Sequence, residues 1–170
     1  MLTRRQLLGG GLAAGAALVI AGLAYEFSPD RALRDPHYRF VILDEEDRAI
    51  VAAIAPVMLA GALPAGAVEQ VVRGTDVAIA GLPLHVRAQI RQLFGVLRFP
   101  LTRMFVAGIW HPWHSANAGE IAAFLQHWRY SPVVQLRSAY DALHQLLMAA
   151  WYGNEQAWPP TGYPGPPKVG

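Results

Sequence analysis

Two histidines near the middle of the chain have a spacing that suits metal chelation. His111 and His114 flank Pro112-Trp113 in a segment that we expect to be a loop. Zinc is held by imidazole nitrogens, but its sites use at least three protein ligands, and the sequence shows no evident third one here. The rigid Pro-Trp turn between the rings therefore favours a structural or surface pair over a metal centre.

A carboxylate and a histidine three positions apart form a second candidate. Asp141 and His144 fall on one face of a predicted helix, which is the spacing that di-iron bundles use. Such centres need two pairs of this kind and further carboxylates, whereas Asp76, Glu120 and Glu155 stand alone in the sequence. The pattern therefore argues against a di-iron site.

Other reactive groups are missing from the sequence. The 170 residues include no cysteine, which excludes disulfides, thiolate metal sites, iron–sulfur clusters and covalent c-type haem. There is no glycine-rich dinucleotide motif after a strand, no phosphate loop and no nucleophile elbow. We therefore expect no catalytic residue, no cofactor and no metal in this chain.

The elements that would position these residues are helices. Apolar residues recur at helical spacing in five segments, and no segment shows sustained period-two alternation. The first segment starts at Asp44, the second covers 67–80 and the third starts at Pro83. The fourth covers 118–130, and the fifth runs from Ser131 to Tyr152. We predict an all-α fold, a small helical bundle over residues 44–152.

Several local features refine this prediction. Asp44 is expected to cap the first helix, and Pro56 predicts either a kink or a short helix there. The apolar residues 101–110 are expected to form a short buried helix or an irregular wall. A basic stripe on the third helix is either a solvated face or a surface for an acidic partner; it consists of Arg87, Arg91 and Arg98.

The first 24 residues form an export signal rather than part of a folded core. Arg4 and Arg5 precede Gln6, Leu7 and Leu8, and an uncharged apolar run continues to Ala24. Because this run is diluted by glycines, it resembles a twin-arginine signal, which exports proteins that are already folded, more than a plain secretory signal. The signal is either cleaved after Ala24 or kept as an anchor. We expect a periplasmic protein associated with the inner membrane.

Charge adds no evidence for a nucleic-acid partner. The chain has 14 Lys and Arg against 12 Asp and Glu, and Arg4 and Arg5 account for the excess. From Tyr25 onward the balance is zero, so there is no general basic character of the kind that nucleic-acid binding requires. Residues 25–43 have little periodicity and are expected to form a linker or an arm laid over the domain.

The chain ends in a segment rich in proline, glycine and aromatic residues. Residues 153–170 are expected to form an extended docking tail, either on a partner chain or on the chain's own bundle. The side chains that we expect to bind a partner lie at the end of the last helix and along this tail. They are Trp151, Tyr152, Trp158, Tyr163, Pro164, Gly165 and Pro166.

Together these features resemble a known family. The signal, the acidic helix start at 43–56, the Trp151–Asn154 segment, Trp158, and the Gly162–Pro166 motif are similar to the gluconate 2-dehydrogenase subunit 3 family. The small subunits of sorbitol and fructose dehydrogenases are similar cases. These are small (gamma) subunits of membrane-bound, FAD-dependent dehydrogenases.

The resemblance implies a non-catalytic role. Such small subunits carry no redox centre and travel with a large FAD-containing subunit of the glucose-methanol-choline (GMC) oxidoreductase type. The large subunit folds around FAD in the cytoplasm, lacks its own signal, and passes through the twin-arginine translocase as a passenger. A multihaem cytochrome c subunit is a further partner in such complexes.

A second interpretation belongs to a different class of protein. The chain would be a stand-alone exported metal-binding protein or enzyme of the helical-bundle kind. It would use His111, His114, Asp141 and His144.

Overall fold

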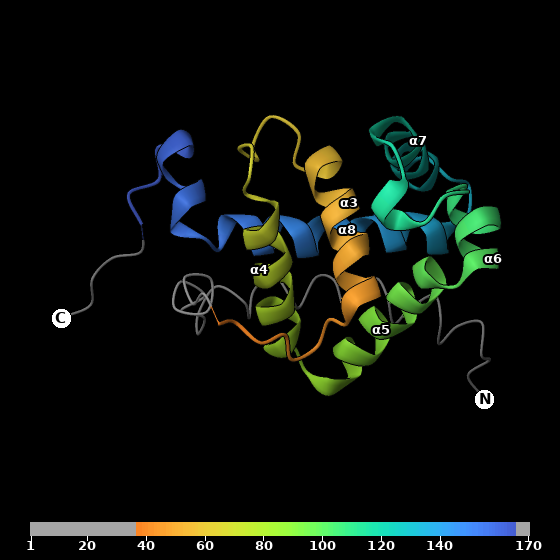
Figure 1. Ribbon diagram of the computed structural model, residues 1–170, viewed down its shortest axis with the longest axis horizontal. Helices are drawn as coiled ribbons and strands as arrows, with labels where there is room; N and C mark the ends of the chain where they lie inside the picture. Colours follow the sequence, from red (N-terminus) through yellow and green to blue (C-terminus); the bar gives the residue numbers. More distant parts are fainter. Residues whose placement is uncertain (1–36, 166–170) are drawn as a thin grey trace.

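The computed structural model describes residues 37–165. All regular elements in this range are helices (Figure 1). The longer helices are α3 (Glu45–Met58), α4 (Val68–Ala80), α5 (Leu84–Arg98), α7 (Ala118–Arg129) and α8 (Val134–Tyr152). Shorter turns are α6 (Pro100–Thr102), the π-helix η1 (Arg103–Ala107), and the 3-10 turns η2 (Trp113–Ser115), η3 (Glu155–Ala157) and η4 (Pro159–Thr161). The predicted all-α fold is confirmed over this range. None of these helices is long and apolar enough to cross a membrane.

The helices pack around one core. Helices α3 and α4 lie side by side, α8 crosses behind both, and α7 contacts α3 and α8 (Figure 1). The contact between α4 and α8 is so close that a Cβ on Gly74 would lie 2.6 Å from the carbonyl oxygen of Ala150. Since real side chains do not approach a backbone oxygen this closely, only glycine fits at this crossing.

The helix starts follow from the sequence. The side chain of Asp44 accepts a hydrogen bond from the backbone N–H of Asp47 at 3.0 Å, which confirms the predicted cap of α3. Asn117 and Glu120 form a reciprocal capping box at the start of α7. Pro56 lies in the last turn of α3, which has 14 residues and ends two residues later at Met58, so it is not the short helix that one alternative predicted.

The arginines of α5 are used mainly within the chain. Arg98 forms ion pairs with Asp44 and Asp47, at 2.7 and 2.6 Å, so it joins the end of α5 to the start of α3. Arg87 donates to the carbonyl oxygens of Ala80 and Leu82 at the end of α4. The acidic surface that Arg98 meets therefore belongs to the chain itself, whereas Arg87 binds backbone carbonyl oxygens.

Residues 38–43, just before α3, lie against α4 through one buried carboxylate. Asp76 has no exposed surface and accepts hydrogen bonds from the backbone N–H groups of Val41, Ile42 and Leu43 at 3.0, 2.9 and 2.7 Å. The Tyr38 hydroxyl donates a fourth bond at 2.5 Å. Burial, together with this bond to Asp76, raises the pKa of Tyr38. All four lone-pair sites of the carboxylate are therefore used, as its burial requires.

The Asp76→Asn variant tests this cluster. The amide keeps the shape of the side chain but turns an NH2 group toward donors, so buried N–H groups lose their acceptor. We expect the free energy of unfolding to fall by about 3 kcal/mol and the melting temperature by roughly 10 °C, measured by circular dichroism. Glu69→Gln is the matched control on the same helix, because its exposed ion pair with Arg73 contributes at most about 0.5 kcal/mol. Equal losses in the two variants would contradict the assignment.

Candidate functional site

The first candidate metal pair serves as a structural contact. His111 Nδ1 lies 2.9 Å from Glu120 Oε1, and Glu120 also closes the capping box of α7. The backbone N–H of Asn117, and then His111, lower the pKa of Glu120. His111 therefore contacts the capping residue Glu120 and supports the loop before α7.

The second candidate pair lies on α8. The Asp141 side chain is exposed, while the His144 ring stacks on Tyr140 with the ring centroids 5.9 Å apart and the planes 17° apart. Nowhere in residues 37–165 do three or more His, Asp or Glu side chains gather as a metal site would require. The structure thus adds no third ligand to either pair within this range.

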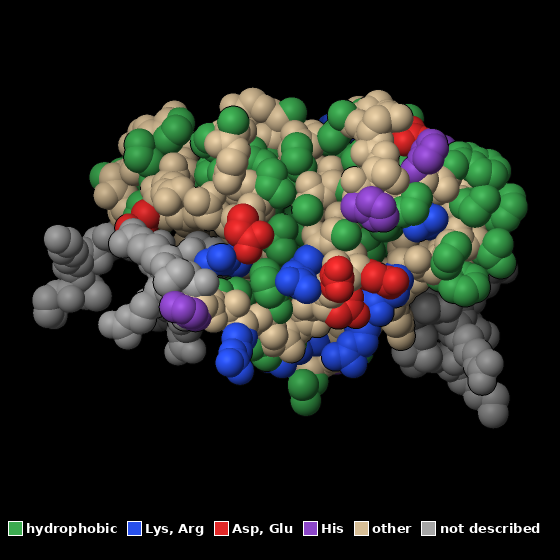
Figure 2. Space-filling view, in the orientation of Figure 1, with side chains coloured by type: hydrophobic (Ala, Val, Ile, Leu, Met, Phe, Trp, Pro, Cys, Tyr) green, Lys and Arg blue, Asp and Glu red, His purple; other side chains and the backbone are tan. Residues whose placement is uncertain are grey.

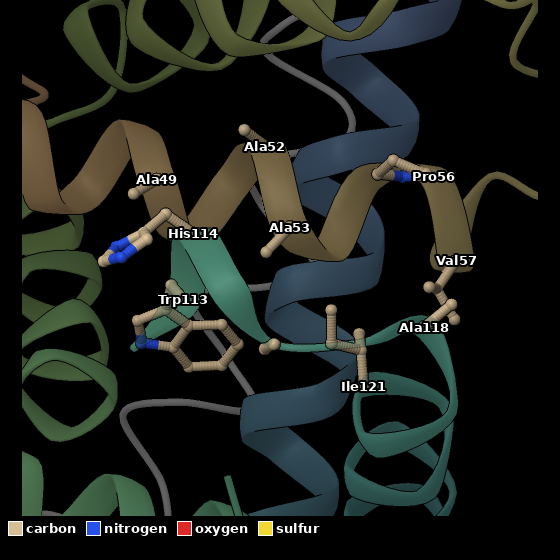
Figure 3. A pocket seen from close by; sticks show the side chains of 10 residues that line it. Ala49, Ala52, Ala53, Pro56, Val57, Trp113, His114, Ala118 and Ile121 are labelled. Carbon is tan, nitrogen blue, oxygen red and sulfur yellow. The ribbon is translucent and has the colours of Figure 1, made fainter. Parts of the chain in front are cut away.

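A small hollow lies between α3, η2 and α7 (Figure 3). Its volume is about 370 Å³, and small apolar side chains of α3, such as Ala49 and Ala53, face Trp113 across it. His114 lies at this hollow and is the one titratable side chain among the residues that line it. A single imidazole without a nucleophile or an acid beside it does not make a catalytic centre.

The segment after α8 folds back on the bundle instead of extending away from it. The 3-10 turns η3 and η4 replace the extended backbone that we expected up to Thr161, because 3-10 turns accept proline at their first positions. The Trp158 ring packs against the core, and its Nε1 donates to the carbonyl oxygen of Tyr152 at 2.8 Å. We call residues 153–165 the C-terminal clasp.

The clasp presents an exposed aromatic surface on a fixed backbone. Tyr163 is half exposed, and its ring meets Trp158 edge-on, with the centroids 5.5 Å apart. Thr161 Oγ1 donates to the carbonyl oxygen of Trp158, and Gly165 approaches the same indole so closely that a Cβ would lie 3.0 Å from it. Pro159, Pro160 and Pro164 lie on the outside.

The predicted partner-binding residues therefore divide into two groups. Trp151 is 2% exposed and packs in the core, so it offers no ring to another chain and belongs to the fold. Trp158 and Tyr152 are partly buried supports of the clasp, whereas Tyr163 and Pro164 are exposed. Pro166 lies outside the described residues.

The sequence analysis missed a second surface. Phe99, Leu101, Phe105 and Trp110 are 55, 56, 76 and 60% exposed, whereas one of the two forms that we expected for residues 101–110 was a short buried helix. We call these four residues the end patch. Of these four residues only Phe105 lies on the π-helix, and no periodicity in so short a segment predicts which of its side chains face outward.

The residues of the predicted export signal lie outside the part of the chain that the structure describes. Arg4, Arg5, Leu7 and Leu8 lie outside the described residues, as does the possible cleavage point after Ala24. Comparison of the chain with protein-family models, curated proteins and solved structures gives no match. The family resemblance therefore rests on the sequence motifs alone.

Truncation of the two clasp rings separates the anchor from the surface. We expect Trp158→Ala to lower the free energy of unfolding by about 2 kcal/mol, because it removes a partly buried ring and its hydrogen bond. Tyr163→Ala removes a half-exposed ring and is expected to change stability by less than about 0.5 kcal/mol. Urea denaturation followed by circular dichroism measures both. A larger loss for Tyr163→Ala than for Trp158→Ala would reverse the assignment.

Proposed function

We propose that the protein is a non-catalytic small subunit that binds an FAD-containing dehydrogenase of the GMC type. It escorts this large subunit through twin-arginine export to the periplasmic side of the inner membrane. The cofactor and the chemistry belong to the partner chain, and a multihaem cytochrome c subunit is a further expected partner.

The C-terminal clasp is the observation that carries this proposal. An exposed tyrosine and three exposed prolines are held on a backbone that Trp158 fixes to the bundle. A surface that is already ordered loses little conformational entropy on binding, so more of its contact energy appears as affinity. Tyrosine is also among the residues most often found at the energetic centre of interfaces.

The signal and the clasp complement each other in this role. Arg4 and Arg5 precede an apolar run of the kind that the folded-protein export route recognises. A large subunit that must fold around FAD in the cytoplasm needs this route, and it needs a bound partner that supplies the signal. One small chain with a signal at one end and a docking surface at the other meets both needs.

Loss of the Tyr163 ring is expected to weaken the complex. A tagged chain purified from its own host should carry about one FAD-containing polypeptide per chain, which denaturation, the flavin absorption spectrum and mass spectrometry identify. Tyr163→Ala is expected to reduce the affinity roughly thirtyfold, which corresponds to about 2 kcal/mol. The retained flavin, measured at equal concentrations of tagged chain, reports this loss.

The matched control is Tyr130→Ala, because Tyr130 is also an exposed tyrosine but follows α7, away from the clasp. It should retain the flavoprotein in full. The docking proposal is wrong if no flavoprotein accompanies the wild-type chain, or if both tyrosine variants retain it equally.

The export part of the proposal has its own test. Replacing both Arg4 and Arg5 by lysine keeps the charge but removes the paired guanidinium groups that define the signal. We expect both this chain and the bound flavoprotein to disappear from the periplasmic fraction and to accumulate in the cytoplasm. Cell fractionation followed by immunoblotting measures this, and undiminished periplasmic protein would contradict it.

A further inference from the structure

The end patch is an apolar surface that the fold leaves exposed to water. Its four large side chains come from the residue after α5, from α6, from η1 and from the loop that follows, within twelve positions of the chain. Figure 2 shows hydrophobic side chains gathered over this end of the molecule. Contiguous exposed apolar surface of this kind marks a contact site in a folded protein, because its exposure to water is unfavourable.

The backbone beneath the end patch is fixed by buried hydrogen bonds. The indole N–H of Trp128 donates to the Val106 carbonyl oxygen, and that of Trp113 donates to the Leu97 carbonyl oxygen, both at 2.9 Å. The π-helix ends at Gly108 in the left-handed region, with φ of 72°, which closes a bond from the N–H of Ile109 to the oxygen of Arg103. The outward direction of Phe105 and Trp110 is therefore set by the fold.

The stretch of sequence that carries the end patch has arginines and no carboxylate, and carboxylates from other elements pair with Arg98 and His111 at its two ends. Residues 77–119 contain no carboxylate but have four arginines: Arg87, Arg91, Arg98 and Arg103. Arg98 is neutralised by the acidic start of α3, whereas Arg103 lies on η1 itself and pairs with no carboxylate of residues 37–165. Exposed aromatic rings beside an arginine without a carboxylate partner suit the interface of a lipid bilayer, where anionic headgroups lie over the acyl chains.

The position of the end patch also matters. It lies at one end of the molecule and the C-terminal clasp lies at the other, with α8 running between them (Figure 1). Residues 25–36 join the described domain to the apolar run that ends at Ala24, and an extended segment of this length reaches about 40 Å. This is close to the diameter of a domain of this size, so any face of the domain can reach the membrane when the run is kept as an anchor.

We infer that the end patch lies in the headgroup region of the membrane, with Phe105 and Trp110 inserted at the boundary of the acyl chains. Tryptophan and phenylalanine favour this layer, and the half-buried Arg103 beside them adds a positive charge that suits anionic lipid. The domain is thereby oriented with its clasp away from the bilayer. This inference is independent of which protein the clasp binds.

The test uses the fluorescence of the full chain in lipid vesicles. The vesicles consist of phosphatidylethanolamine and phosphatidylglycerol with bromine on the acyl chains near the headgroup, which quenches tryptophan at that depth. Trp113, Trp128 and Trp151 are buried in the protein, so Trp110 is the reporter of contact. We expect bromine-dependent quenching that is lost in Trp110→Phe and reduced in Phe105→Ser.

Trp158→Phe is the matched control, because Trp158 lies in the clasp at the opposite end of the molecule and should not approach lipid. This variant should therefore keep the quenching of the wild-type chain. The inference is overturned if Trp110→Phe is quenched as strongly as the wild type, or if the quenching disappears only in Trp158→Phe. It is also overturned if Trp110 is shielded by a second copy or by the flavoprotein and no lipid quenching occurs.

Discussion

The fold depends on the buried carboxylate of Asp76. A fully buried carboxylate is unfavourable unless each of its acceptor sites is satisfied, and here the donors come from residues 38–43, more than thirty positions earlier in the chain. The same bonds satisfy backbone N–H groups that would otherwise lack partners. Residues 38–43, which lead into the first core helix, are thus fixed to α4 as part of the folded domain, and a chain that has not formed α4 cannot hold them.

Close helix packing sets the shape around this cluster. Gly74 lets α4 approach the backbone of α8, and Arg98 ties the end of α5 to the acidic start of α3. Because α8 spans the molecule, its contacts place the clasp and the end patch far apart (Figure 1). Two surfaces separated in this way can be occupied together, one by a protein partner and the other by lipid, without competition between them.

The candidate chemistry and the candidate surfaces differ in how the fold uses them. His111 pairs with a capping carboxylate, and His144 stacks on a tyrosine, so these histidines stabilise local structure. Tyr163, Phe105 and Trp110, in contrast, are exposed, and hydrogen bonds from the Trp158 and Trp128 indoles fix the backbone near them. Side chains that the structure supports but does not bury are the ones available for binding, and this favours a docking role.

The sequence by itself determined the helical class, the cap at Asp44, the loop around His111 and the aromatic character of the C-terminal segment, because each depends on residues close together in the chain. Only the tertiary structure decided the rest. Asp76 stands alone in the sequence, but in the fold its carboxylate is surrounded by donors from distant residues. Trp151 lies in the core, and Trp158 anchors the clasp to the bundle. For residues 101–110 we expected a short buried helix or an irregular wall; Ala107 and Ile109 are buried there, whereas Leu101, Phe105 and Trp110 are exposed. Burial depends on which surfaces meet in three dimensions, and an apolar run of ten residues carries no period that fixes which side faces inward.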